Sequence, residues 1–114
     1  MTDNEAAANA VVMRGRLVGA PVEKTLPSGD AIVTFRVSVP RARTAMTRGS
    51  RQTSDWVDCV AWAARVRRTV SGWLPGDPVV VEGALRRRFY RGEAGTGTRL
   101  EIEALRARKA GTDP

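Results

Sequence analysis

Apolar and polar residues alternate along most of the chain with the period of two that is typical of half-buried strands. The segment AIVTFRVSV, residues 31–39, is the clearest case, because its odd positions from Val33 to Val39 are apolar and Thr34, Arg36 and Ser38 are polar. Five runs are expected as strands, at residues 11–18, 31–39, 55–62, 79–90 and 98–107.

The period changes between the third and fourth runs. Val66, Val70 and Trp73 recur at helical spacing, and PGD at 75–77 ends the segment. Trp73 is therefore expected to pack in the core. Gly15 and Gly83 lie inside the first and fourth runs, where they suit the bulges or tight bends that closing a small barrel requires.

The order strand, strand, strand, helix, strand, strand predicts an all-β protein with one helix. A helix between the third and fourth strands of a five-stranded Greek-key barrel is the arrangement of the OB-fold, which binds oligonucleotides or oligosaccharides on one face. The expected domain spans residues 10–107. Residues 1–9 and 108–114 have little to bury and are expected to be disordered ends.

Strand parity assigns residues to the two faces of the barrel wall. In the third run Val57, Cys59 and Ala61 share one parity, and Trp56 and Trp62 share the other. If the small residues face the core, Cys59 is a core residue and both tryptophans face outward. Each presents on the order of 200 Å², which is costly to leave in water.

The fourth and fifth runs divide in the same way. The residues expected to face inward are Val79, Val81, Gly83, Leu85, Leu100, Ile102 and Ala104. Those expected to face outward on the fourth run are Glu82, Ala84, Arg86, Arg88 and Tyr90.

The charge is strongly positive for a chain of 114 residues, at +7 with no histidine, and only Lys24 and Lys109 are lysine. The planar guanidinium of arginine binds phosphate through two hydrogen bonds and stacks on bases, and lysine is less suited to either contact. A GC-rich genome would also explain the scarcity of lysine, but not the clustering of the arginines. One cluster is the segment 40–54, a long, mobile basic hairpin loop without an acid.

Several classes of protein are excluded by the sequence. No apolar stretch reaches the roughly 18 residues of a membrane span, and Met1 to Ala10 lacks the features of a signal peptide. Cys59 is alone, so no disulfide framework exists, and a cytoplasmic location follows. A lone cysteine without histidine, with no metal-ligand cluster and no Walker-type loop, favours neither catalysis nor a metal or cofactor.

The segment DWVDCVAWAARVRRTVSGWLPGDPVVVEGALRRRFY, residues 55–90, resembles the bacterial single-stranded DNA-binding protein family, and the resemblance extends over about residues 10–106. It implies that Trp56, Trp62 and Tyr90 stack on bases. Arg43 stands where some members have a further stacking tryptophan. An unpaired acid would repel phosphate on this face, so Asp58 is expected to pair with an arginine, Arg36 or Arg86.

The resemblance and the charge together predict a sequence-tolerant binder of single-stranded DNA that protects it in replication, recombination or repair. The expected binding residues are Trp56, Trp62, Tyr90, Arg36, Arg43, Arg48, Arg51, Arg86 and Arg88. Two alternatives stay open: an RNA-binding OB module, and a structural or adaptor protein of a nucleoprotein complex. A solvated basic edge that guards against strand pairing is the alternative role of Arg86 and Arg88.

The resemblance also implies a homo-oligomer, most often a tetramer, associated with the nucleoid. The first run is apolar on both sides of Gly15, which suits an interface. Family members usually continue into a linker and an acidic tip that recruits repair and replication enzymes. This chain ends at RKAGTDP, so it is expected to coat DNA without that recruitment if it is full length, or to be trimmed.

Overall fold

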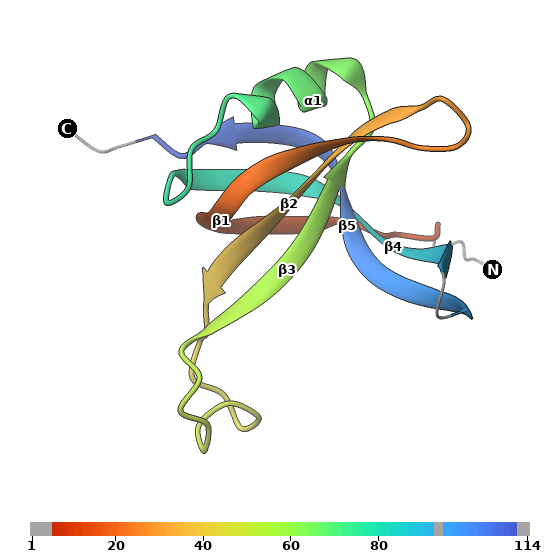
Figure 1. Ribbon diagram of the computed structural model, residues 1–114. Helices are drawn as coiled ribbons and strands as arrows, with labels where there is room; N and C mark the ends of the chain where they lie inside the picture. The colour runs from red at the N-terminus through yellow and green to blue at the C-terminus, as the bar shows by residue number, and fades with distance from the viewer. Residues whose placement is uncertain (1–5, 93–94, 112–114) are drawn as a thin grey trace.

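Five strands and one helix make up the fold in the computed structural model, which describes residues 6–92 and 95–111 (Figure 1). The elements are β1 (Val11–Thr25), β2 (Ala31–Pro40), β3 (Ser54–Ala61), α1 (Ala64–Ser71), β4 (Pro78–Gly92) and β5 (Gly95–Lys109). The strands close into a barrel in the order β1-β2-β3-β5-β4. The predicted five-stranded barrel with a helix between the third and fourth strands is confirmed.

The barrel closes because β1 pairs with two neighbouring strands and because β3 pairs with β5. The first half of β1 pairs with β4 and most of its length pairs with β2, with a register shift between Val18 and Val22 where Gly19 has a φ of 74°. The sequence placed the end of this strand at Val18, but the shift lets it continue to Thr25. β3 and β5 complete the barrel as a parallel pair at only two positions, Cys59 with Ile102 and Val60 with Glu103.

The core fills the barrel from the inward positions of every strand. Val33, Phe35 and Val37 of β2 are buried, as their alternation predicted. Figure 1 shows α1 lying across one end of the barrel, and the helix buries Val66 and Val70 there. Trp73 is buried as predicted, with its ring edge-on to Phe35 at a centroid distance of 5.6 Å.

Gly15 and Gly83 allow neighbouring strands to approach closely. A Cβ atom on Gly15 would lie 2.2 Å from the carbonyl oxygen of Ser38, and one on Gly83 would lie 1.8 Å from that of Glu103. Neither distance is possible for a real side chain. The β4–β5 register shift adjoins Gly83, as predicted. The shift in β1 lies between Val18 and Val22, so of the bulge or tight bend expected at Gly15 the bulge does not occur.

The β4–β5 hairpin extends past the barrel. Leu85 and Leu100 were predicted to face the core, but they are 45% and 52% exposed. The prediction was wrong because β1 pairs with β4 only as far as Gly83, and β3 pairs with β5 only at Ile102 and Glu103. Leu85 and Leu100 lie beyond these positions toward the hairpin tip, where no third strand pairs with the ribbon. Ile102 and Ala104, which lie within the barrel, are buried as predicted.

The ordered fold reaches further at both ends than the sequence suggested. β5 continues to Lys109, and the Ala110 N–H donates to the Pro78 carbonyl at 2.8 Å, so Arg108 and Lys109 belong to a strand. The Asn9 side chain bonds both backbone groups of Leu85, at 2.8 and 2.9 Å. The expected disorder of 1–5 and 112–114 falls outside the described residues. Within them, no helix has the length and apolar character to cross a membrane.

Candidate nucleic-acid interface

Trp56 is a largely exposed aromatic side chain on β3. It lies on the outward parity of β3, opposite Ser38 of β2, and 63% of its surface is exposed. The guanidinium carbon of Arg36 lies 5.3 Å from the centroid of its ring, within the range of a cation–π contact. The ring therefore has an arginine on one side and solvent around the rest.

Arg36 also neutralises the acid on this face. Its Nε lies 2.9 Å from Oδ1 of Asp58, the residue directly opposite it on β3. The predicted pairing of Asp58 with an arginine is thus confirmed, and Arg36 is the partner. The pair removes a bare carboxylate from beside Trp56.

Tyr90 provides a second aromatic surface on the β4–β5 hairpin. It stands opposite Gly97 and is 48% exposed. A Cβ atom on Gly97 would lie 2.6 Å from the Tyr90 hydroxyl oxygen, so the ring packs against the bare backbone of that glycine. The guanidinium carbon of Arg99 lies 5.7 Å from the Tyr90 ring centroid. Arg99 was not among the binding residues predicted from the sequence, although it lies on the last predicted strand, two residues after Gly97.

A small hollow connects the two arginines that lie over aromatic rings. It has a volume of about 220 Å³, and its polar lining consists of Thr34, Arg36, Asp58, Arg99 and Glu101. Residues of β2, β3 and β5, together with apolar residues of β1, therefore line one hollow.

Two further predicted phosphate-binding arginines have carboxylate partners. Arg86 Nε lies 3.0 Å from Glu103 Oε1, and Arg88 forms an ion pair with Glu101, whose side chain is 2% exposed. Arg36 forms an ion pair with Asp58, so three of the arginines predicted to bind phosphate already have a carboxylate partner. They contribute less net positive charge to this face than the sequence suggested.

The loop between β2 and β3 carries further arginines, which differ from those on the strands in their ion pairing. Figure 1 shows it projecting away from the barrel. Arg41 at its base bonds Asp55 at 2.9 Å, and a turn forms where the Arg48 N–H donates to the Thr44 carbonyl. Farther along, among the residues with described placement, no carboxylate lies within 4.0 Å of the exposed side chains of Arg43, Arg48 and Arg51.

Trp62 lies at the other end of β3 from Trp56. It follows the last strand residue, Ala61, and is half-buried. Its backbone carbonyl accepts a hydrogen bond from Nη1 of Arg67 on α1. Val60 shares the parity of the two tryptophans but is fully buried, so the face between them is not a continuous exposed strip.

Cys59 lies behind this surface and is 1% exposed, as predicted for a core residue. Burial raises the pKa of its thiol from 9.0 to about 12, and the neighbouring charges of Asp58 and Glu101 add to the effect. Such a thiol is a poor nucleophile. No cluster of three side chains of metal-ligand type occurs in the described ranges.

Comparison with known proteins gives consistent matches to one family. Residues 8–109 match the model of the single-strand binding protein family. Over 87 residues, which are 76% of this chain, the sequence is 33% identical to a single-stranded DNA-binding protein of Bacillus cereus and 32% identical to single-stranded DNA-binding protein A of Bacillus subtilis. The match covers 50% and 49% of those relatives, so the chain aligns with about half of their length.

A solved structure shows the same fold. The Plasmodium falciparum SSB in complex with ssDNA superposes with a TM-score of 0.69 at 24% identity. The superposition covers 92% of this chain and 95% of that chain.

Proposed function

The chain belongs to the single-strand binding protein family, and from this premise we propose that it binds single-stranded DNA without sequence specificity and without catalysis. The observation that carries the proposal is the exposure of Trp56 on the barrel wall, beside a basic loop. A large apolar ring in water is costly, and a nucleobase is a flat partner that would cover it.

Bases stack on Trp56, Trp62 and Tyr90 in this proposal. Every base has a π-face, so the contact is sequence-tolerant and contributes about 1–3 kcal/mol per base. Arg36 and Arg99 lie over the rings of Trp56 and Tyr90. Each arginine either shifts when a base arrives or stays as the second plane of a stack.

Phosphates are bound mainly by Arg43, Arg48 and Arg51 of the β2–β3 loop, which have no carboxylate partner among the residues with described placement. Arg36, Arg86 and Arg88 take a smaller part, because their acids compete with phosphate for the guanidinium. A duplex hides the faces of its bases, so the same surface discriminates against double-stranded DNA.

Tryptophan fluorescence on addition of oligo-dT tests the proposal. Trp73 is buried, so quenching reports on Trp56 and Trp62, and a Trp56→Phe variant separates the two. Binding of dT oligomers over duplex supports the proposal. An equal or greater affinity for rU oligomers favours an RNA-binding module, and no binding to either favours an adaptor role.

We further propose that the protein forms a homo-oligomer, most often a tetramer in this family, and acts on the nucleoid in replication, recombination or repair. Val12 of β1 supports an interface, because its large apolar side chain is exposed although its backbone pairs with Glu82 of β4. Light scattering of the dilute protein checks the assembly. A monomer at all concentrations contradicts it.

A further inference from the structure

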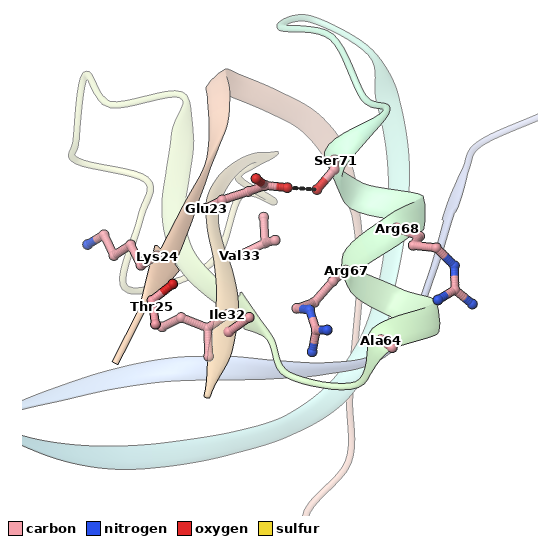
Figure 2. A pocket seen from close by; sticks show the side chains of 10 residues that line it. Glu23, Lys24, Thr25, Ile32, Val33, Ala64, Arg67, Arg68 and Ser71 are labelled. Atoms are coloured by element: carbon pink, nitrogen blue, oxygen red, sulfur yellow. Dashed lines mark hydrogen bonds between the residues drawn. The ribbon is translucent and has the colours of Figure 1, made fainter. Parts of the chain in front are cut away.

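A cleft of about 820 Å³ separates α1 from the end of the β1–β2 hairpin (Figure 2). The buried side chains of Ile32 and Val33 close it from below, and Lys24 and Arg67 contribute positive charge to its lining. Glu23 is the one acid in the lining, and its carboxylate accepts a hydrogen bond from the Ser71 hydroxyl at 3.4 Å. None of the binding residues predicted from the sequence lines this cleft.

Arg67 is placed to bind an anion there. Figure 2 shows its side chain extending from α1 toward the space between the helix and the hairpin, and Arg68 also lines the cleft, from the next position of α1. A guanidinium has five N–H donors, and Nη1 of Arg67 donates to the Trp62 carbonyl. Across residues 6–92 and 95–111, no carboxylate lies within 4.0 Å of Arg67 or Lys24.

One hydrogen bond links the cleft to the candidate interface. Arg67, which lines the cleft, donates a hydrogen bond to the backbone carbonyl of Trp62, one of the three proposed stacking residues. The helix adds Arg65 and Arg68 and contains no acid. A strand leaving Trp62 along α1 therefore meets arginines that form no ion pair within the described part of the chain, unlike Arg36, Arg86 and Arg88.

We propose that this cleft is a further phosphate-binding site, in which the backbone of a single strand continues past Trp62 between α1 and the β1–β2 hairpin. The inference rests on the proposed single-stranded DNA binding. Arg67 supplies a forked donor for a phosphate, and Lys24 supplies a second positive charge from the hairpin. Glu23 opposes binding because its charge has the sign of phosphate.

The test compares dT oligomers of about 4 and about 16 nucleotides, the lower and upper site sizes of a single OB-fold. Lys24→Gln should weaken binding of the longer oligomer about threefold to tenfold and lower its logarithmic salt slope by about 0.7, the value for one phosphate on a single strand. The shorter oligomer, which fits on the stacking surface alone, should bind Lys24→Gln as it binds the wild type. Glu23→Gln should strengthen binding of the longer oligomer only.

Arg67 needs a separate comparison, because it also holds the Trp62 carbonyl. Arg67→Gln should weaken the longer oligomer, and Arg67→Lys, which keeps the charge but not the fork, should recover part of the loss. Arg14→Gln is the matched control, since Arg14 lines a different cleft beside Pro78 and Ala110. It should leave the difference between the two oligomers unchanged.

The outcomes separate this inference from the function on which it rests. If the wild type binds neither oligomer, the proposed function fails. If the wild type binds both, but Lys24→Gln and Glu23→Gln leave the longer oligomer unaffected, the proposed function stands and the phosphate site is overturned. Equal effects of Lys24→Gln on both lengths, or of Arg14→Gln and Lys24→Gln on the longer one, also overturn it, because the loss is then one of general charge.

Discussion

Arg88 of β4 holds the buried carboxylate of Glu101 on β5, with its Nη2 atom 3.4 Å from Oε2. The side chains are 28% and 2% exposed, respectively. Removing one partner from such a pair leaves an uncompensated charge out of water. Arg88 was selected from the sequence for phosphate binding, but this contact gives it a structural role as well.

Arg88→Ala should therefore destabilise the protein by about 3–5 kcal/mol, as is typical when one partner of a buried pair is lost. The double variant Arg88→Met/Glu101→Leu should recover most of the loss, because no lone charge remains. Urea denaturation measures both. Arg86→Ala is the control, with an expected cost of at most about 1 kcal/mol because its pair with Glu103 is more exposed. Equal losses for Arg86→Ala and Arg88→Ala would contradict the structural role.

The exposed Trp56 and the buried Trp73 should behave in opposite ways. Trp56→Ala should weaken dT binding by about 1–3 kcal/mol and leave the unfolding midpoint nearly unchanged, since its ring is largely exposed. Trp73→Ala should cost about 3–5 kcal/mol of stability, because it empties a core position beside Phe35. Fluorescence titration and urea denaturation on both variants check this. A binding defect confined to Trp73→Ala would remove Trp56 from the interface.

The salt dependence of binding should depend on the β2–β3 loop. Arg48→Gln/Arg51→Gln should lower the logarithmic salt slope by about 1.4, at about 0.7 for each phosphate on a single strand. Arg86→Gln should change the slope by less than about 0.7, because Glu103 already competes for that guanidinium. Titrations with oligo-dT at several salt concentrations give the slopes. A larger change for Arg86→Gln would place the phosphate path along β4.

Gly97 should be required for the position of the Tyr90 ring. In Gly97→Ala the new methyl group would overlap the ring, so Tyr90 must move and dT binding should weaken, with little change in stability at this exposed hairpin. A double-mutant cycle with Tyr90→Ala measures the coupling. If Gly97→Ala weakens binding equally when Tyr90 is already alanine, the effect does not pass through the ring.

Cys59 should make the protein less stable in alkali. Its pKa is raised from 9.0 to about 12 by burial and by Asp58 and Glu101, so above pH 9 the unfolded chain loses a proton that the folded chain keeps. The contribution of this thiol to the free energy of unfolding is unaffected below pH 9 and is lost progressively as the pH rises to about 12. Cys59→Ala should show a shallower fall in unfolding free energy over this range. Parallel curves for both proteins would exclude the thiol as the cause.

Alternation predicted most of the barrel because it reports burial on one face of a strand. It succeeded for Val33 to Val37 and for Cys59, Ile102 and Ala104, which all lie where a third strand or the helix covers the sheet. It failed for Leu85 and Leu100, which have the same pattern but lie beyond the last residues of β4 and β5 that pair with β1 and β3. Parity assigns a side chain to a face, but only the tertiary arrangement decides whether that face is covered.

The candidate site was predictable in its aromatic residues and less so in its charges. The exposure of Trp56 and Tyr90 follows from parity, as does the approach of Arg36 to Asp58 across β2 and β3. The partners of Arg86 and Arg88 come from β5, at positions that depend on the β4–β5 register. A sequence without that register cannot distinguish a free arginine from a paired one, which is also why the role of Arg99 was missed.

The parallel contact of β3 with β5, made at two residue pairs, is the narrowest joint of the barrel wall. Trp56 belongs to one side of that joint, and Tyr90, through its partner strand β5, belongs to the other. A strand of DNA that stacks on both rings would contact both sides of this joint at once. If the proposed stacking holds, the joint would open less readily while DNA is bound, and bound DNA would stabilise the closed barrel.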